Sequence, residues 1–371
     1  MKAAAAQPRP GRSGSRGPAP QKRLRIVAWV RNAVAAGRFP PGSALPDRSW
    51  FERRFGATRA TVQLAFDRLA EEGFTRAVRH LGTFVVDPPP FAGRYLLALS
   101  GTADAPSDDM IGRALREAAA RVGARRGVRF EARHVLDEGP DSPRYAALLE
   151  ELEGQRWAGA FLRALSSNRG LRTIANVDHV PVAGLYAEDP RAGGSLSCAL
   201  SPPAPAGPTA ACRRLFEKCL RAGARSVFVL SSGSAAGEEA AVRALAGRVG
   251  LKMGPDAYQT AWIDPPGLRQ ARRLLRLALS PRSAYLPDAV VLLDDNFVAP
   301  LDAALRGNFG LTAPERFFVA AAGNLPALPQ TSLPVAFCGL DLEKTLDSFV
   351  AWAEALHAGV RAPERPRLFA F

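Results

Sequence analysis

The chain contains no run of about 18 consecutive apolar residues, so the sequence predicts no membrane-spanning helix. Only four alanines follow Lys2 before the first polar residue, which is too short for the apolar core of a secretory signal. We therefore expect a cytoplasmic protein. Cysteine and histidine are scarce, with four of each in the chain. Neither type shows metal-ligand spacing, so we expect no metal, no cofactor and no disulfide framework.

Length and composition are those of an ordinary globular protein. The 371 residues suggest two or three domains, and 47% hydrophobic with 23% charged residues excludes wholesale disorder. The formal net charge of +14 is unevenly distributed, because residues 1–90 carry 16 basic and 6 acidic residues. Most of the positive excess therefore lies in the first quarter of the chain. This asymmetry indicates an N-terminal module that meets a polyanion.

Two polar segments divide the chain. Residues 1–21 include QPRPGRSGSRGPAP, which has almost nothing apolar to bury and is predicted to be a disordered basic tail. Consecutive prolines in residues 87–93 remove backbone donors and favour a semi-rigid linker. We expect a small domain at 22–86 and a larger one at 94–371.

The small domain has the pattern of three helices and a hairpin. In the third predicted helix, which begins after Thr58, four apolar residues recur at helical spacing and define a buried face: Val62, Ala65, Phe66 and Leu69. Two short apolar runs at 74–78 and 83–86 flank a polar turn. A tight turn between the last two helices and a terminal hairpin predict a winged helix-turn-helix.

The larger domain alternates strand-like and helix-like segments. Such alternation predicts an α/β fold with parallel sheets covered on both faces. A Gly, Pro and Ser-rich stretch at 192–208 interrupts the pattern, so we expect two lobes with a cleft between them. The predicted strands are 95–100, 128–135, 159–164, 180–185, 226–230, 289–293, 317–321 and 335–338, and the predicted helices are 108–123, 143–155, 209–222, 237–249, 267–279, 297–308 and 341–357.

Two stretches resemble known families. GRFPPGSALPDRSWFERRFGATRATVQLAFDRLAEEGF, followed by LGTFVV, resembles the GntR-type winged helix of transcriptional regulators. PDAVVLLDDNFVAPLDAALRGNFGLTAPERFFVAAAGN resembles the LacI/GalR-type effector domain, which has a periplasmic-binding-protein-like fold. Together they imply a winged-helix regulator fused to a two-lobe sensor.

The GntR resemblance implies that the start of the third helix enters the major groove of DNA. The sequence departs from the family at three points: the basic residue after Leu-Pro is shifted to Arg48, Gln63 replaces an Arg, and His80 stands in the wing tip. The predicted DNA-binding residues are Arg48, Ser49, Thr58, Arg59, Ala60, Thr61, Gln63, Arg76, Arg79 and His80.

The LacI resemblance implies an effector at the carboxyl ends of the parallel strands. Asp295 is the strongest candidate, because a carboxylate can accept hydrogen bonds from paired sugar hydroxyls. Polar residues at strand ends are equally well explained as helix caps. Glu238 replaces the sugar-clamping Arg of the family, which puts a conventional pyranose in doubt. The predicted effector-binding residues are Ser100, Thr102, Arg163, Ser231, Ser232, Asp294, Asp295 and Asn324.

These observations predict a DNA-binding regulator, a repressor that acts as a homodimer on double-stranded operator DNA and responds to a sugar-like small molecule. Two alternatives stay open: a degenerate, ligand-independent dimerisation domain, and an enzyme or binding module built on the larger domain. An enzyme is disfavoured, because the Gly-Ser run at 231–237 lacks a P-loop pattern. The three lysines beyond residue 90 also lack the setting of a pyridoxal-phosphate lysine.

Overall fold

A computed structural model describes residues 19–102, 104, 109–138, 141–163, 173–174, 177, 180–185, 197–199, 208–232, 237–283, 285–310, 316–360 and 363–371. The chain divides into two compact units. Unit 1 comprises Met1–Ala92 together with His357–Val360, and unit 2 comprises Gly93–Leu356 and Arg361–Phe371.

Unit 1 is a winged helix-turn-helix. Asp47 accepts a hydrogen bond from the backbone N–H of Trp50 and caps the second helix, and Thr58 caps the third in the same way. Gly56, between them, has φ 57°, a left-handed conformation that glycine adopts without strain and that ends the second helix. The elements are α1 (Ala19–Ala35), α2 (Arg48–Phe55), α3 (Arg59–Glu71), β1 (Thr75–Val78) and β2 (Gly82–Val85), the strands pairing antiparallel.

The core of unit 1 is aromatic and includes a segment from far along the sequence. Phe51 is fully buried, and its ring meets those of Trp29 and Phe66 edge to face. His357 packs its ring against Phe91, and its Nδ1 lies 2.6 Å from the carbonyl oxygen of Ala35. That carbonyl belongs to the last turn of α1, where backbone acceptors have no partner within the helix.

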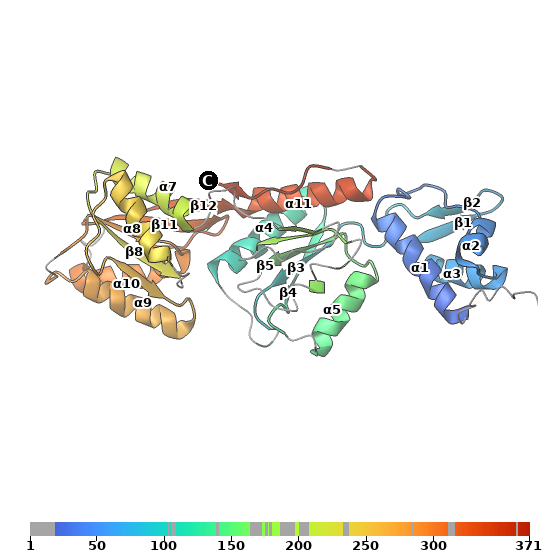
Figure 1. Ribbon diagram of the computed structural model, residues 1–371, viewed down its shortest axis with the longest axis horizontal. Coiled ribbons are helices and arrows are strands. Elements are labelled where there is room, and N and C mark those ends of the chain that lie inside the picture. Colours follow the sequence, from blue (N-terminus) through green and yellow to red (C-terminus); the bar gives the residue numbers. More distant parts are fainter. Residues whose placement is uncertain are drawn as a thin grey trace, which may run out of the picture. The chain divides into compact units, whose positions relative to one another are not determined.

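Unit 2 contains two sheets (Figure 1). The first has the order β4-β3-β5-β6-β7, with all neighbours parallel. Its central strands are buried on both faces, as a sheet covered by helices requires. The strands are β3 (Arg94–Leu99), β4 (Arg129–His134), β5 (Gly159–Arg163), β6 (Val182–Leu185) and β7 (Ser197–Ala199), and the helices between them are α4 (Met110–Arg126) and α5 (Pro143–Glu153).

The second sheet has the order β13-β12-β11-β10-β8-β9 and is parallel except for its last strand. The chain completes the first sheet before it forms the second. The helix Leu342–His357 then packs on the first sheet, and the last strand adds to the second sheet. The strands are β8 (Val227–Ser232), β9 (Tyr258–Ala261), β10 (Ala289–Leu292), β11 (Phe318–Leu325), β12 (Val335–Asp341) and β13 (Phe369–Ala370), and the helical elements are α7 (Pro208–Arg221), α8 (Glu238–Val249), α9 (Pro265–Ala278), η1 (Asp295–Phe297), α10 (Val298–Phe309) and α11 (Leu342–His357).

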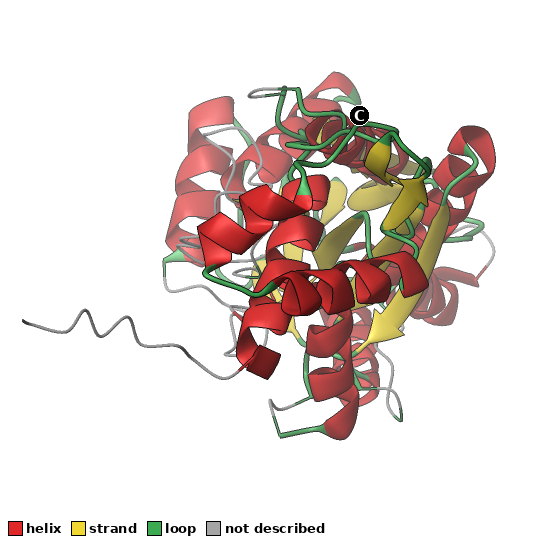
Figure 2. Ribbon diagram, turned by 90° about the vertical axis from the view of Figure 1, so that its right-hand side faces the viewer, coloured by secondary structure: helices red, strands yellow, loops and turns green. Residues whose placement is uncertain are grey.

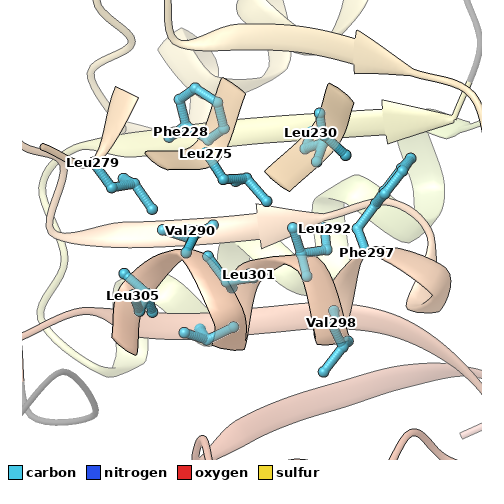
Figure 3. Packing of buried hydrophobic residues seen from close by; sticks show 14 of the residues in the cluster. Phe228, Leu230, Leu275, Leu279, Val290, Leu292, Phe297, Val298, Leu301 and Leu305 are labelled. Atoms are coloured by element: carbon cyan, nitrogen blue, oxygen red, sulfur yellow. The ribbon is translucent and has the colours of Figure 1, made fainter. Parts of the chain in front are cut away.

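Helices cover both faces of the second sheet, and Figure 2 draws the helices of the chain in red and its strands in yellow. On the second sheet, α9 and α10 bury leucines against one face, where Leu275 and Leu301 lie beside Val290 in Figure 3. Helices α7 and α8 cover the opposite face. Helix α11 packs on the first sheet, where a Cβ on Gly159 would lie only 2.8 Å from Phe349.

The predicted winged helix and the parallel two-lobe α/β architecture are both confirmed. Helix α1 begins at Ala19, within the range 1–21 expected to be tail, whereas residues 1–18 of that tail lie outside the described residues. The sequence did not predict β7, β9 or β13. Strand β7 lies within the stretch 192–208 that was expected only as an interruption, and the other two are short strands at the edges of the second sheet.

Candidate nucleic-acid interface and effector site

Helix α3 presents a small polar surface because its opposite side is fixed in the core. Val62 and Leu69 are fully buried, whereas Arg59 and Ala60 are exposed at the start of the helix. Gln63 lies one turn further on the same side, and its Nε2 donates to the Asp67 carboxylate at 2.6 Å. Arg59 has no ion pair with a carboxylate in the described part of the chain. The α3 surface therefore offers one free guanidinium and one amide.

Four of the predicted DNA-contact residues make contacts within unit 1. The Thr58 and Thr61 hydroxyls lie 2.9 Å apart, and Thr61 is 8% exposed. Thr61 therefore lies off the outward face that carries Arg59. On α2, the Ser49 hydroxyl donates to Asp47 at 2.9 Å, and the Arg48 guanidinium lies over the Phe66 ring. Arg48 is thus held against Phe66 in the middle of α3.

The wing brings the remaining predicted DNA residues together. Arg76 is exposed on β1, and Arg79 and His80 are exposed in the turn that joins β1 to β2. His80 has φ 63°, and Leu81 beside it is 72% exposed. The wing tip is therefore a basic turn with an uncovered apolar side chain.

The predicted effector residues sit where parallel strands end. In the first sheet, Ser100 directly follows β3, and Arg163 is the last residue of β5. These two strands are parallel neighbours. In the second sheet, Asp294 follows β10, and Asn324 lies near the end of the adjacent β11. Because parallel strands end at one edge, each sheet gathers its polar side chains there.

Arg163 is held by a buried ion pair. Its Nη2 lies 3.0 Å from Oδ2 of Asp109, and the two side chains are 12% and 7% exposed. Burial lowers the pKa of Arg163, and the charges of Asp109, Asp294 and Asp137 oppose that effect. Asp109 also caps α4, accepting from the Gly112 N–H at 2.7 Å. The positive charge of Arg163 is therefore compensated within the protein.

Asp295 is the most buried carboxylate at this edge, with 4% exposure. Its Oδ2 accepts a hydrogen bond from Asn324 Nδ2 at 3.0 Å. Burial, and then the neighbouring Asp294, raises the pKa of Asp295 to about 7. Asp294 caps η1 and accepts from both nitrogens of Asn296, at 3.0 Å and 2.7 Å.

A hydrogen bond joins the two lobes at this place. The backbone N–H of Met110, the first residue of α4, donates to Asn296 Oδ1 at 3.2 Å. The same helix start carries Asp109, which pairs with Arg163. The structure thus places Arg163 of one lobe near Asp294, Asp295 and Asn324 of the other lobe of unit 2.

The predicted serines and threonine differ in what they can do. Ser231 is buried, and its hydroxyl donates to Glu238 at 2.7 Å, so it ties β8 to α8. Ser100 donates to the Arg163 carbonyl at 3.1 Å and thereby joins β3 to β5. Ser232 is exposed at the end of β8, and Thr102 is half-buried. The Ser231 and Ser100 hydroxyls therefore link elements of the fold, and neither of these two hydrogen bonds is the helix cap that was the alternative expected for such residues.

Sequence reasoning missed three residues at this edge. Asp109 could have been found as a cap before a helix that follows a strand, and Asn296 as the third polar residue after β10. Trp262 directly follows β9 at the carboxyl edge of the second sheet and is 70% exposed. Its signal was hidden because β9 was not predicted.

A separate hollow of about 350 Å³ lies at the opposite, amino-terminal edge of the second sheet. It is lined by residues that include Phe228, Pro255, Leu277 and Tyr285. None of the predicted effector residues lines it. In the described part of the chain, no three potential metal ligands gather, and no helix is long and apolar enough to cross a membrane.

Unit 1 has the fold of a winged-helix DNA-binding domain, and unit 2 is a two-lobe α/β domain. Residues 22–85 match the model of the bacterial regulatory proteins of the gntR family. Over 60 residues the chain is 36% identical to the mannosyl-D-glycerate transport/metabolism system repressor MngR of Escherichia coli. That match covers 16% of this chain and 25% of the repressor, so the chain matches only a quarter of that relative's length. The N-terminal domain is a GntR-type winged helix.

Solved structures of LacI-type regulators share the fold of the remainder. A LacI family transcriptional regulator from Bifidobacterium animalis matches with a TM-score of 0.53 and 13% identity, covering 75% of this chain and 94% of that one. The complex of the transcriptional regulator CelR with cellobiose matches with a TM-score of 0.52 and 14% identity, covering 88% and 98%. The C-terminal domain therefore has the fold of LacI-type regulators. The relatives are regulators rather than enzymes.

Proposed function

We propose that this chain is a cytoplasmic transcriptional repressor that binds operator DNA as a homodimer and responds to a neutral, sugar-like effector. The observation that supports it most is the joining, in one chain, of a GntR-type winged helix to a LacI-like fold whose lobes meet in a polar cluster. The repressor assignment follows the name of the partial relative MngR.

DNA reading is proposed for the outward face of α3. Arg59 can donate two parallel hydrogen bonds to guanine O6 and N7, and Gln63 can bond adenine once it leaves Asp67. Arg76, Arg79 and His80 of the wing, with Thr58, Ala60, Arg48 and Ser49, supply backbone and groove contacts. Thr61 is buried, so we assign it to holding the turn. Two such heads in a dimer would read a pseudo-palindromic site.

The charges at the strand ends suggest the class of effector. Arg163 is already paired with Asp109, so its positive charge is compensated within this cluster of described residues. An anionic ligand such as a sugar phosphate would meet the carboxyl groups of Asp294 and Asp295 there. Hydroxyl groups would instead donate to these oxygens. We propose a neutral polyol, with Ser232 and Thr102 as additional contacts.

Trp262 supports the same class. An exposed indole at the same carboxyl edge of the second sheet offers an apolar face on which a sugar ring can stack. Ligand contacts on both lobes would change the equilibrium between lobe arrangements, because a ligand shifts a conformational equilibrium through its difference in affinity for the two states. The hydrogen bond between Met110 and Asn296 is one inter-lobe contact that such a shift would alter.

The decisive experiment is genome-wide DNA capture with the full-length chain, followed by thermal shift with a panel of neutral sugars and sugar phosphates. Enriched palindromic sites and a neutral stabiliser whose effect is lost in Asp295→Asn would support the proposal. Enriched sites without any stabiliser would favour a ligand-independent dimerisation domain. The absence of enriched sites would favour an enzyme or binding module instead.

A further inference from the structure

One side of helix α9 packs on the second sheet, and the other side carries four exposed arginines. Ala271 and Leu275 are fully buried on the second sheet, and Figure 3 shows Leu275 and Leu279 directed at the strands. This packing fixes the rotation of the helix. The outward face then carries four exposed arginines at helical spacing: Arg269, Arg272, Arg273 and Arg276.

These four side chains, the α9 arginine face, have no acidic residue beside them in the sequence of the helix. None forms an ion pair within the described residues, and residues 265–283 contain no Asp or Glu. Asp264, just before the helix, is engaged as its cap and accepts from Gly267 at 2.8 Å. Elsewhere in unit 2, arginines such as Arg125 and Arg126 pair with carboxylates of α11. The α9 arginine face is therefore an uncompensated positive surface.

We propose that the α9 arginine face binds the phosphate backbone of duplex DNA, as a second contact surface separate from the winged helix. Guanidinium groups bind phosphate oxygens bidentately and carry their charge at every physiological pH. From Arg269 to Arg276 the helix rises about 10 Å, and phosphates of one DNA strand recur about every 3.4 Å along the axis, so several are within reach.

Other occupants fit this face less well. A second copy would place one arginine face against another, and like charges repel. An acidic, partly apolar protein segment could use Leu277, which is 73% exposed, but Leu277 is the sole leucine among the exposed positions of α9, where four arginines and Gln270 predominate. Unit 1 already carries a DNA-binding domain. Covalent linkage raises the effective concentration of DNA at unit 2, so weak phosphate contacts there add to the affinity.

The inference rests on the DNA-binding domain and not on the proposed effector. Its test compares the full-length chain with a variant in which Arg269, Arg272, Arg273 and Arg276 are all changed to Gln. A matched control carries Arg213→Gln, Arg214→Gln, Arg221→Gln and Arg248→Gln, exposed arginines on α7 and α8, which cover the opposite face of the sheet. Thermal melting verifies that both variants fold, and Arg273→Gln alone serves if the quadruple variant does not.

The measurement is the dissociation constant for a random-sequence duplex of about 40 base pairs over a range of KCl concentrations. Each arginine that neutralises a phosphate contributes about 0.9 to the magnitude of the slope of log affinity against log salt concentration. The magnitude of this slope should therefore fall by up to about 3.6 in the α9 variant and should hardly change in the control. A wild-type slope in the α9 variant, or an equal loss in the control, would overturn the proposal. Poly-glutamate binding that depends on α9 while the DNA slope stays unchanged would also overturn it, in favour of an acidic protein.

Discussion

Arg163 and Asp109 form an ion pair of 3.0 Å that is almost completely removed from solvent, at the edge where the effector residues gather. The pair joins the end of β5 to the start of α4, and Met110 beside it contacts the other lobe. Asp109 neutralises Arg163, which the sequence suggested as a ligand-binding cation. The carboxyl groups of Asp294 and Asp295 therefore remain as hydrogen-bond acceptors for a ligand.

Changing Asp109 to Asn should destabilise unit 2. Asparagine can still cap α4, but Arg163 would remain charged and buried without its counter-ion, which costs about 3 kcal/mol. Urea unfolding measures the loss. Glu117→Gln, which breaks the exposed pair with Arg121, is the control and should change stability by about 0.5 kcal/mol or less. Equal effects of both changes would contradict the account. Arg163→Leu added to Asp109→Asn should restore part of the loss.

Asp295 should make the stability of unit 2 depend on pH. Its folded pKa of about 7 is above the ordinary value of 3.8, so between these values the folded state holds a proton that the unfolded state has released. The stability it contributes is complete below the unfolded pKa and is lost as pH rises through about 7. From pH 6 to pH 8 we expect the free energy of unfolding to fall by about 1.4 kcal/mol, the free energy that corresponds to one pKa unit.

Asp295→Asn should abolish that dependence while retaining an acceptor for Asn324. Melting temperatures at the two pH values, for wild type and variant, provide the measurement. The difference between the two proteins isolates this group, because every other titratable residue is the same in both. A variant that keeps the full pH dependence would show that Asp295 is ionised in the folded protein at neutral pH.

His357 should stabilise the end of α1 although it is more than 300 residues away in sequence. Its ring N–H donates to the Ala35 carbonyl, a helix-end acceptor that otherwise lacks a partner. His357→Ala should weaken the last turn of α1 by about 1 kcal/mol or more, seen as faster amide exchange there. His357→Phe keeps a ring against Phe91 but removes the donor. Unchanged exchange in both variants would rule out this role.

The sequence predicted most of the fold because local signals agreed with the tertiary structure. Asp47 and Thr58 cap helices, and the spacing of Val62 and Leu69 placed α3 correctly. Strand β9 was missed because the edge of a sheet requires little burial, so its sequence Tyr-Gln-Thr-Ala has no apolar run. Missing β9 also concealed Trp262.

The structure shows side-chain partners of the candidate site residues that the sequence did not indicate. The effector-binding role of Arg163, Asp295 and Asn324 stays a prediction, although all three lie at or just after the ends of parallel strands. The sequence could not show that Asp109 would neutralise Arg163, because the two are 54 positions apart and meet through sheet pairing. Likewise Ser231 faces α8 rather than the site, since alternate residues of a strand point to opposite faces.

The most direct test of the proposed regulator is the affinity of Arg59→Ala for a captured operator, measured by fluorescence anisotropy beside wild type and beside Arg248→Ala, an exposed arginine on α8. We expect Arg59→Ala to lose about 1 to 3 kcal/mol of operator binding with an unchanged melting temperature, and Arg248→Ala to bind as wild type does. An operator affinity for Arg59→Ala equal to that of wild type would contradict the assignment of α3 as the DNA-reading helix.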